Sequence, residues 1–533
     1  MALTQTLEEQ AAFEIEEFLE SERNKDLLRF STAGSVDDGK STLIGRLLYD
    51  SRNVYEDHVR SVTRTTGGGT ASSSIDFALL TDGLRAEREQ GITIDVAYRF
   101  FSTARRKFII ADTPGHEQYT RNMATGASTA DLAIILVDAR KGILTQSRRH
   151  AYIAALLGIP RVVAAINKMD LVDYSEDVFR QLSSDFAELA AQVGLRSVEA
   201  IPISALEGDN VVHRSKRMPW YTGPALLEHL ESVELASTNA HAPFRMPVQR
   251  VIRPDQSFRG FAGQIAAGTI HPGDEIVALP SGRTSRVESI VTFDGNLDSA
   301  SAPLSVTLTL EDELDISRGD LIAIADERPA VTNHFEASIV WLHAQPLALN
   351  RRYLLKHASH IVPAWVRSVR LRIDIETLEP RPASTLDLNG IGAIEIETDR
   401  PILADLYDES RVTGSFILID PASNATVGAG MIREVLTTAS HAQEQMPRIV
   451  LGEPSLLENL EQRLLDLEYP VVRTRVQDHG VWRALHEAGV IVLVESQQLP
   501  QVVSGSFTLE PAADASVEGL LAALDISAGE ERA

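Results

Sequence analysis

A short glycine-containing stretch near the start of the chain carries a lysine and a serine at the spacing of a phosphate-binding loop. Residues 34–41 read Gly-Ser-Val-Asp-Asp-Gly-Lys-Ser. Backbone N–H groups can turn inward at such glycines and bind phosphate oxygens at the positive end of the following helix. Lys40 would bridge the outer phosphates, and the Ser41 hydroxyl would bind Mg2+. The nucleotide-contacting residues predicted in this stretch and directly after it are Gly34, Val36, Asp37, Asp38, Gly39, Lys40, Ser41 and Thr42.

The segments on either side of this loop support that interpretation. Residues 27–33 have the apolar character of a short strand, and residues 42–48 have the apolar spacing of a helix. A strand, then the loop, then a helix is the context in which this motif binds phosphate. The alternative, a glycine-rich turn beside a helix, is less favoured because the complete pattern arises rarely by composition alone.

A second motif, Asp112-Thr113-Pro114-Gly115-His116, follows the apolar run 108–111. It places the Asp112 carboxylate at the carboxyl end of a predicted strand, where it can reach Mg2+ through a water. The N–H of Gly115 could bind a terminal phosphate. Thr93 follows a charged, helical run that breaks at Gly91, and it is too weak a signal to interpret alone.

Two further motifs indicate which base is bound. Asp170, in the run Asn-Lys-Met-Asp at 167–170, offers a carboxylate that can accept both the ring N–H and the exocyclic amine of guanine. Adenine lacks this donor pair, so the sequence predicts GTP rather than ATP. Asn167 and the Lys168 stem would frame the ring, and the Ala205 N–H would meet the guanine oxygen. A four-residue run of this kind is by itself more often a solvated loop. The residues predicted around the base are Asn167, Lys168, Asp170, Ser204, Ala205 and Leu206.

The pattern of strands and helices predicts a multidomain α/β plus β fold. Residues 28–240 alternate continuous apolar strands with helices, which predicts a parallel sheet covered on both faces. Because this segment contains the nucleotide motifs described above, we expect it to be a P-loop GTPase domain. Residues 241–332 and 333–440 have short strands and turn signals typical of two antiparallel β-barrels, with strands such as 369–375 and 391–397. Residues 1–27 predict an amphipathic helix that packs on the first domain, and residues 447–533 a small appended α/β domain.

Composition excludes several classes of protein. The 533 residues include no cysteine, so disulfides, iron–sulfur clusters and thiol nucleophiles are excluded, and a reducing compartment is favoured. We expect a cytoplasmic protein, since no signal peptide or membrane span is evident. The formal charge of −25 argues against binding to nucleic acid or an anionic membrane. His343, His357 and His360 have no metal-ligand spacing.

Taken together, the motifs resemble those of translation-factor-type GTPases. More narrowly, residues 34–42, 86–98, 118–128 and 204–211 resemble the GTPase large subunit of heterodimeric sulfate adenylyltransferase, and the resemblance extends from residue 24 to about 434. It implies a cytoplasmic nucleotidyltransferase complex of sulfate assimilation in which this chain hydrolyses GTP. A separate small subunit of the ATP pyrophosphatase type would join sulfate to the AMP part of ATP, giving adenosine 5'-phosphosulfate and pyrophosphate.

The resemblance also implies roles for individual residues. Thr93 would close on Mg2+ and the terminal phosphate, Gly115 would sense that phosphate, and His116 would orient the attacking water. The metal-binding set would be Ser41, Thr93 and, through water, Asp112. The segments around Thr93 and Gly115 would then be the switches.

Two other functions compete with this one. An elongation factor that carries charged tRNA shares the three-domain layout, but it needs a basic RNA-binding surface, which the charge of −25 disfavours. A structural GTPase without activity is disfavoured because every nucleotide-contacting position holds a competent residue.

The last segment of the chain carries a separate hypothesis. Some relatives carry a fused adenylylsulfate kinase, and residues 464–472 and 484–494 faintly resemble parts of it. Where the kinase needs a phosphate loop, residues 452–455 read Gly-Glu-Pro-Ser, and no lysine follows residue 356. Pro454 lacks a donor N–H and Glu453 would repel phosphate. The tail is therefore either a catalytically dead kinase remnant or an unrelated appended domain.

Overall fold

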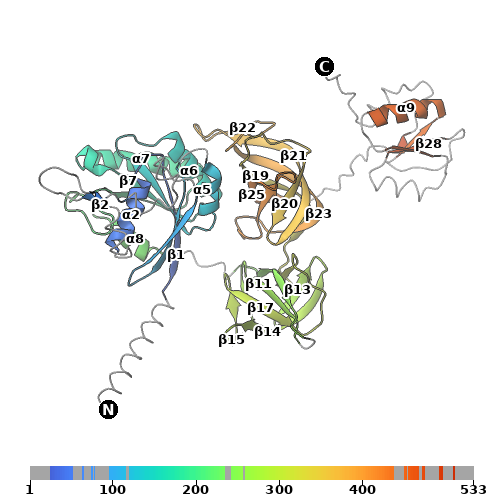
Figure 1. Cartoon of the computed structure of the whole chain (residues 1–533), viewed down its shortest axis with the longest axis horizontal. Helices are drawn as coiled ribbons and strands as arrows, with labels where there is room; N and C mark the ends of the chain where they lie inside the picture. Colours follow the sequence, from blue (N-terminus) through green and yellow to red (C-terminus); the bar gives the residue numbers. More distant parts are fainter. Residues whose placement is uncertain are drawn as a thin grey trace, which may run out of the picture. The chain divides into compact units, whose positions relative to one another are not determined.

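The computed structural model describes residues 25–51, 63–64, 74–75, 77, 95–115, 119–234, 242–255, 258–436, 449–452, 454–466, 471–474, 491–495 and 508–509. The chain divides into two compact units, Met1–Leu436 and Thr437–Ala533, each described by itself (Figure 1). The N-terminal helix predicted over residues 1–27 lies almost entirely outside the described residues.

The first unit begins with a six-stranded sheet in the order β4-β5-β1-β6-β7-β8. All neighbouring strands are parallel except β4, which pairs antiparallel with β5 at one edge. The parallel sheet predicted from the sequence is confirmed, whereas the antiparallel edge strand was not predicted. The strands are β1 (Leu27–Ala33), β4 (Ala97–Ser102), β5 (Lys107–Asp112), β6 (Leu132–Asp138), β7 (Arg161–Asn167) and β8 (Val198–Pro202).

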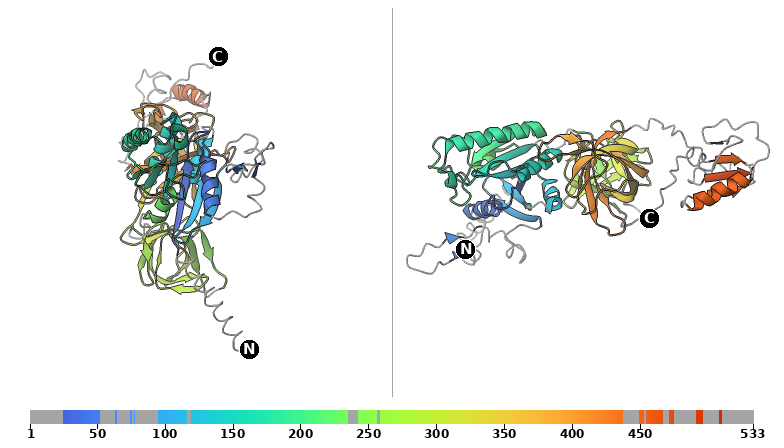
Figure 2. Two further views of the ribbon diagram at one scale, coloured as in Figure 1. Left: turned by 90° about the vertical axis from the view of Figure 1, so that its left-hand side faces the viewer. Right: turned by 90° about the horizontal axis from the view of Figure 1, so that it is seen from above.

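Helices cover both faces of this sheet (Figure 2). One core packs α5, α6 and α7 on one face, and a second core packs α2 and α8 on the other. Every residue of β6 is buried, which explains its unbroken apolar run. The helices are α2 (Lys40–Asp50), α5 (Thr120–Ala127), α6 (Thr145–Leu156), α7 (Glu176–Val193) and α8 (Leu226–Ser232), with a 3₁₀ turn η3 (Met169–Val172).

An antiparallel sheet around a core that includes Phe244, Phe261 and Leu308 follows the first domain. The chain from Arg245 to Ile252 closes it: β9 pairs with β18, and β10 then pairs with β11 at the other end of the strand order. The strands on this path are β9 (Arg245–Pro247), β10 (Arg250–Ile252), β11 (Gly260–Gln264), β13 (Glu275–Leu279), β14 (Arg283–Thr292), β17 (Ser305–Leu310) and β18 (Leu321–Ile324). Shorter pairs are formed by β12 (Thr269–Ile270) with β16 (Ala300–Ser301) and by β15 (Gly295–Leu297) with β14.

The next antiparallel sheet is a closed barrel, as predicted, in the order β20-β24-β25-β19-β23-β21, with β21 pairing back to β20. Its strands are longer than their apolar runs suggested, since β21 begins at His360 and β23 continues to Ala404. The strands are β19 (Ala330–Trp341), β20 (Arg352–His357), β21 (His360–Ile373), β23 (Ile391–Ala404), β24 (Ser415–Ile419) and β25 (Thr426–Val435), with β22 (Pro380–Arg381) beside β21.

Polar contacts join this closed barrel to both preceding domains. The buried Arg245 guanidinium donates to both carboxylate oxygens of Asp405, with Nε 3.0 Å from Oδ2 and Nη2 3.0 Å from Oδ1. At the end of α6, Tyr407 Oη donates to Leu157 O at 3.0 Å and Arg433 Nη2 to Leu156 O at 3.1 Å. Barrel side chains therefore satisfy the last carbonyls of a helix in the nucleotide domain.

The second unit is a small parallel α/β sheet in the order β27-β28-β26-β29. Its described elements are β26 (Ile449–Gly452), α9 (Pro454–Asp466), β27 (Val471–Thr474), β28 (Ile491–Glu495) and β29 (Thr508–Leu509). Among the described residues of both units, no helix is long and apolar enough to cross a membrane.

Candidate nucleotide-binding site

The loop of residues 34–39 connects β1 to α2, so the helix begins at Lys40 as the motif predicts. Gly39 has φ 92°, and a Cβ atom there would lie 2.5 Å from Asn167 Nδ2, so glycine is required for both reasons. The loop is braced internally, since Ser35 N–H donates to Asp38 Oδ2 at 2.7 Å. Its backbone is therefore held in a compact turn at the start of a helix, the arrangement that binds anions.

Lys40 and Asp112 meet at the carboxyl ends of β1 and β5. The parallel register aligns Thr32 with Asp112, and Lys40 Nζ lies 3.2 Å from Asp112 Oδ1. Both side chains are buried, with exposed fractions of 8% and 3%. The structure thus brings together the two groups predicted to face the outer phosphates and the metal.

Gly115 packs directly against the phosphate loop. A Cβ atom on Gly115 would come within 2.3 Å of the Gly34 carbonyl oxygen, so only glycine fits between these segments. Thr93 and His116, the other two residues predicted to act in hydrolysis, lie outside the described residues.

Two carboxylates near the loop have perturbed acidities. Burial raises the pKa of Asp38 to about 6, although the hydrogen bond from Ser35 acts in the opposite direction. Burial also disfavours ionised Asp138, but hydrogen bonds from Arg140 and Lys168 outweigh it and hold its pKa well below the usual range. The Lys168 ammonium lies 2.9 Å from Asp138 Oδ2. Asp138 thus positions Lys168, a role that its place at a strand end did not reveal.

Asn167 joins the phosphate loop to residues 204–209, which follow β8 and are called the base loop below. Its Nδ2 donates to Asp38 O at 2.7 Å, and its Oδ1 accepts from Ala205 N–H at 2.9 Å. The sequence predicts that the Ala205 N–H faces the guanine oxygen, and in the structure it donates to the Asn167 amide oxygen. A three-centre hydrogen bond would let that N–H serve both acceptors. Lys168 also reaches the phosphate loop, donating to Asp37 O.

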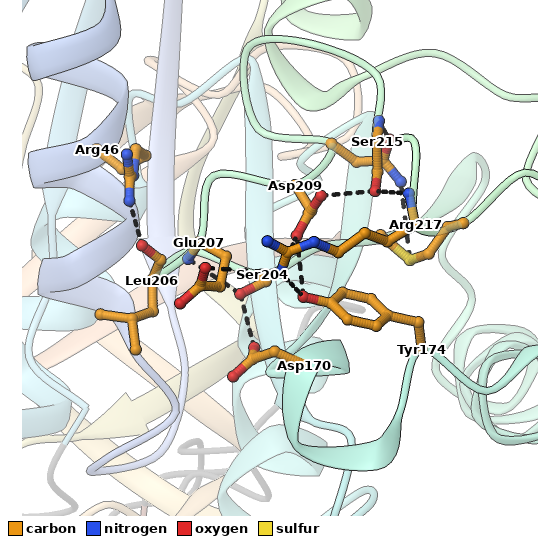
Figure 3. Close-up of polar contacts among 11 residues, drawn as sticks. Arg46, Asp170, Tyr174, Ser204, Leu206, Glu207, Asp209, Ser215 and Arg217 are labelled. Carbon is orange, nitrogen blue, oxygen red and sulfur yellow. Dashed lines mark hydrogen bonds and ion pairs between the residues drawn. The ribbon is translucent and has the colours of Figure 1, made fainter.

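The Asp170 carboxylate is oriented by Ser204 (Figure 3). Ser204 Oγ donates to Asp170 Oδ1 at 2.6 Å, and the same hydroxyl accepts from Glu207 N–H at 3.1 Å. Ser204 is itself buried, and its N–H donates to Asp209 O at 3.1 Å. The carboxylate predicted to read the base therefore has a defined orientation.

Several residues that support this loop were not predicted. Around Ser204 they form a polar network that Figure 3 displays. The sequence does not indicate such a role for any one of them, because an arginine inside a helix or an aspartate in a loop is ordinarily solvated. The additional residues are Arg46, Tyr174, Asp209, Ser215 and Arg217.

Among the described residues, no group of three or more His, Cys, Asp or Glu side chains could hold a metal ion. A Mg2+ ion bound with a nucleotide needs few protein ligands, because phosphates and waters complete its shell. The Ser41 hydroxyl and the Asp112 carboxylate supply oxygen atoms of the type that Mg2+ prefers.

Comparison with known proteins assigns two of the domains. The family described as the elongation factor Tu GTP binding domain matches residues 25–238, and the family described as GTP-eEF1A C-terminal domain-like matches residues 334–433. The chain therefore contains a GTP-binding domain of the elongation factor Tu type.

Relatives that match most of the chain identify its family more narrowly than the two domain matches do. Sulfate adenylyltransferase subunit 1 of Alteromonas mediterranea is 53% identical over 81% of this chain and 91% of its own length. The protein of the same name from Teredinibacter turnerae is 54% identical over 80% and 92%. The bifunctional enzyme CysN/CysC of Rhodopirellula baltica is 54% identical over 81% of this chain and 67% of its own length.

These relatives bear on the alternatives left open by the sequence. Their names support the adenylyltransferase resemblance and give no support to a tRNA carrier. The match with the bifunctional enzyme spans 433 residues, against 431 for the Alteromonas protein. The kinase-remnant hypothesis for the tail stays a prediction. At this identity over most of both chains, the protein belongs to the sulfate adenylyltransferase subunit 1 family.

Proposed function

We propose that this chain is the GTP-hydrolysing subunit of a two-subunit sulfate adenylyltransferase. Its partner would be a small subunit of the ATP pyrophosphatase type that converts ATP and sulfate to adenosine 5'-phosphosulfate and pyrophosphate. The shared family name, which designates a subunit 1, supports the existence of a partner. We expect the complex to act in the cytoplasm.

One geometric relationship supports the GTP part of this proposal. Asn167 bonds to the phosphate loop through Asp38 O and to the base loop through Ala205 N–H. One side chain therefore links the two loops directly, as expected if both belong to one site. Asp170, oriented by Ser204, would accept the ring N–H and the exocyclic amine of guanine.

The phosphate end of the site would work as follows. Backbone N–H groups of residues 34–40 would hold the phosphates, and Lys40 would neutralise charge that develops on the outer oxygens during transfer. Mg2+, bound by Ser41 and Thr93 and by Asp112 through water, would supply charge neutralisation and alignment of the phosphates. His116 would orient the water that attacks the terminal phosphorus, with GDP and phosphate as products.

The coupling has an energetic reason. Sulfate and phosphate joined in a mixed anhydride form a high-energy bond, so synthesis of adenosine 5'-phosphosulfate from ATP runs uphill. Hydrolysis of GTP can drive this synthesis only if one step of the partner's reaction requires a particular conformation, and if that conformation depends on whether this chain binds GTP or GDP. The contacts between α6 and the closed barrel supply a physical connection along which such a change could pass.

Co-expression with the small subunit provides the test. We expect pyrophosphate release that depends on both sulfate and ATP and that rises when GTP is added. A non-hydrolysable GTP analogue serves as the control, because it fills the site without supplying hydrolysis. Pyrophosphate release that is the same with GTP, with the analogue and without either would contradict the proposed coupling.

A further inference from the structure

Arg46 extends from α2 to the predicted base loop. Its Nε donates to Ala205 O at 3.2 Å. Its Nη2 donates to Leu206 O, the contact that Figure 3 shows. A guanidinium presents several donors in a planar fork and stays charged at any physiological pH. One side chain of the helix that begins at Lys40 thus binds two successive carbonyl groups of the loop that follows β8.

The Arg46 guanidinium is enclosed by other groups. It lies 4.0 Å from the centre of the Phe77 ring, a cation–π distance, and Nη1 lies 3.8 Å from Asp50 Oδ1. The loop turns around it at Gly208, where φ is +86° and a Cβ atom would lie 3.4 Å from Nη1. With only 15% of the side chain exposed, Arg46 has little freedom to leave these carbonyls.

The far end of the same loop is held separately. The Asp209 carboxylate accepts from Ser215 Oγ at 2.6 Å and from Tyr174 Oη at 3.1 Å, and Arg217 Nη1 lies 3.6 Å away (Figure 3). Side chains therefore hold residues 204–209 at both ends. At Ala205, Arg46 binds the carbonyl oxygen while Asn167 binds the N–H, which is next to the expected position of the guanine oxygen.

We propose that Arg46 is a positioning residue for base recognition. By holding the carbonyls of Ala205 and Leu206, it keeps the Ala205 N–H directed at Asn167 and at the 6-oxo group of guanine. This inference rests on the proposed GTP site. It predicts that Arg46 affects recognition of the base oxygen and the lifetime of the bound nucleotide, rather than the hydrolytic step.

The test uses the full-length chain with Mg2+ and two readouts. One is the dissociation rate of N-methylanthraniloyl-GDP, and the other is the ratio of affinities for GTP and for 2-aminopurine riboside triphosphate, which lacks the 6-oxo group. Arg46→Ala should release the nucleotide roughly tenfold faster or more, since charged hydrogen bonds of this kind are lost, and should lower the GTP preference. Arg46→Lys keeps the charge but loses the fork, and it should show a smaller change in both.

Arg106 offers a matched control in the same domain. It also donates to two backbone carbonyls, Leu230 O at 3.0 Å and Val233 O at 2.7 Å, at the far end of α8. Arg106→Ala should lower Tm without changing the base preference. The inference is overturned if Arg46→Ala and Arg46→Lys change only Tm, or if they release every nucleotide faster with an unchanged affinity ratio. Failure of the unsubstituted chain to bind the labelled GDP would instead contradict the proposed function.

Discussion

Gly115 and Gly34 are in direct contact: a Cβ atom on Gly115 would lie 2.3 Å from the Gly34 carbonyl oxygen. The contact follows from sheet topology, because β1 and β5 are parallel neighbours and each glycine follows one of them. A shift of the segment after β5 must therefore displace the phosphate loop or be resisted by it. This contact gives the predicted sensing role of Gly115 a mechanical basis.

Gly115→Ala should weaken GTP more than GDP. The added methyl group must push the two segments apart, and the Gly115 N–H would then lie too far from the terminal phosphate that only GTP carries. Loss of one charged hydrogen bond corresponds to roughly a tenfold loss of affinity. Equilibrium titration with both nucleotides measures the difference. Equal weakening of GTP and GDP would show that the substitution damages the loop alone.

Asp170→Asn should shift the base preference from guanine toward xanthine. Ser204 Oγ donates to Asp170 Oδ1, and the same bond to an asparagine would leave the amide NH2 directed at the base. That group is a donor where guanine needs an acceptor, and xanthine supplies the matching oxygen. In the assembled complex, XTP should then replace GTP in stimulating pyrophosphate release.

Asp177→Asn, on the exposed first turn of α7, is the control for Asp170→Asn and should keep the GTP preference. The assignment of Asp170 fails if the Asp170→Asn variant still prefers GTP. Equal binding of ATP and GTP by the unsubstituted protein would remove the guanine assignment as a whole.

The sequence alone predicts those site residues that belong to recognisable nucleotide-binding motifs. Asp112 and Asn167 are the last residues of strands, Lys40 and Asp170 come shortly after strands, and the carboxyl ends of parallel strands lie at one edge of a sheet. Their proximity thus follows from topology, and topology follows from the alternation of apolar strands and helices.

The supporting residues could not be found in the same way. Arg46 and Ala205 are far apart in sequence, and their contact depends on the position of α2 relative to the turn after β8. The edge strand β4 was also missed. Its Tyr98 and Phe100 are exposed while Phe101 is buried, so it lacks the continuous apolar run of the inner strands. Periodicity identifies elements, but contacts between distant side chains require their three-dimensional arrangement.

Asp38→Asn should stabilise the nucleotide-free protein more at pH 8 than at pH 5. Burial raises the pKa of Asp38 from 3.8 to about 6. Between these two pH values the Asp38 carboxyl group is protonated in the folded state and ionised in the unfolded state. The carboxyl group therefore costs folding free energy that grows as the pH rises from about 4 to about 6 and is fully present above that range. The neutral amide avoids this cost.

The free energy of unfolding should rise by on the order of 2 kcal/mol at pH 8. Part of the full effect is lost because the amide NH2 takes the place of Asp38 Oδ1, a buried atom with no hydrogen bond to the described residues, so the NH2 group has no acceptor there. Thermal unfolding at both pH values measures it. Asp298→Asn, at an exposed position, is the control for the substitution itself and should change Tm little. A gain that is equal at the two pH values would disprove the assignment of the effect to Asp38 ionisation.

His116→Ala should leave GTP affinity nearly intact and slow hydrolysis by roughly a hundredfold or more, as expected for loss of a group that orients the attacking water. Formation of adenosine 5'-phosphosulfate by the complex should fall in parallel. His271→Ala, in an exposed turn of the first barrel, is the control. Unchanged turnover of the assembled His116→Ala complex would exclude this role.

The tail should not phosphorylate adenylylsulfate. In the nucleotide domain, residues 34–39 separate β1 from α2 and form the predicted phosphate loop, whereas in the tail β26 ends at Gly452 and α9 already begins at Pro454. A single intervening position is too short for a loop that surrounds phosphates, and Pro454 has no N–H to offer. The parallel order β27-β28-β26-β29 is compatible with a kinase ancestor, but it also occurs in unrelated α/β domains.

Incubation of the purified chain with adenylylsulfate and γ-labelled ATP measures this activity directly. We expect no labelled product, and deletion of residues 447–533 should leave GTP hydrolysis unchanged, because all residues of the proposed GTP site belong to the first unit. A genuine kinase added to the same mixture is the positive control. Transfer of label to adenylylsulfate by the chain alone would show that the tail retains a phosphate-binding site, and the dead-remnant hypothesis would then be wrong.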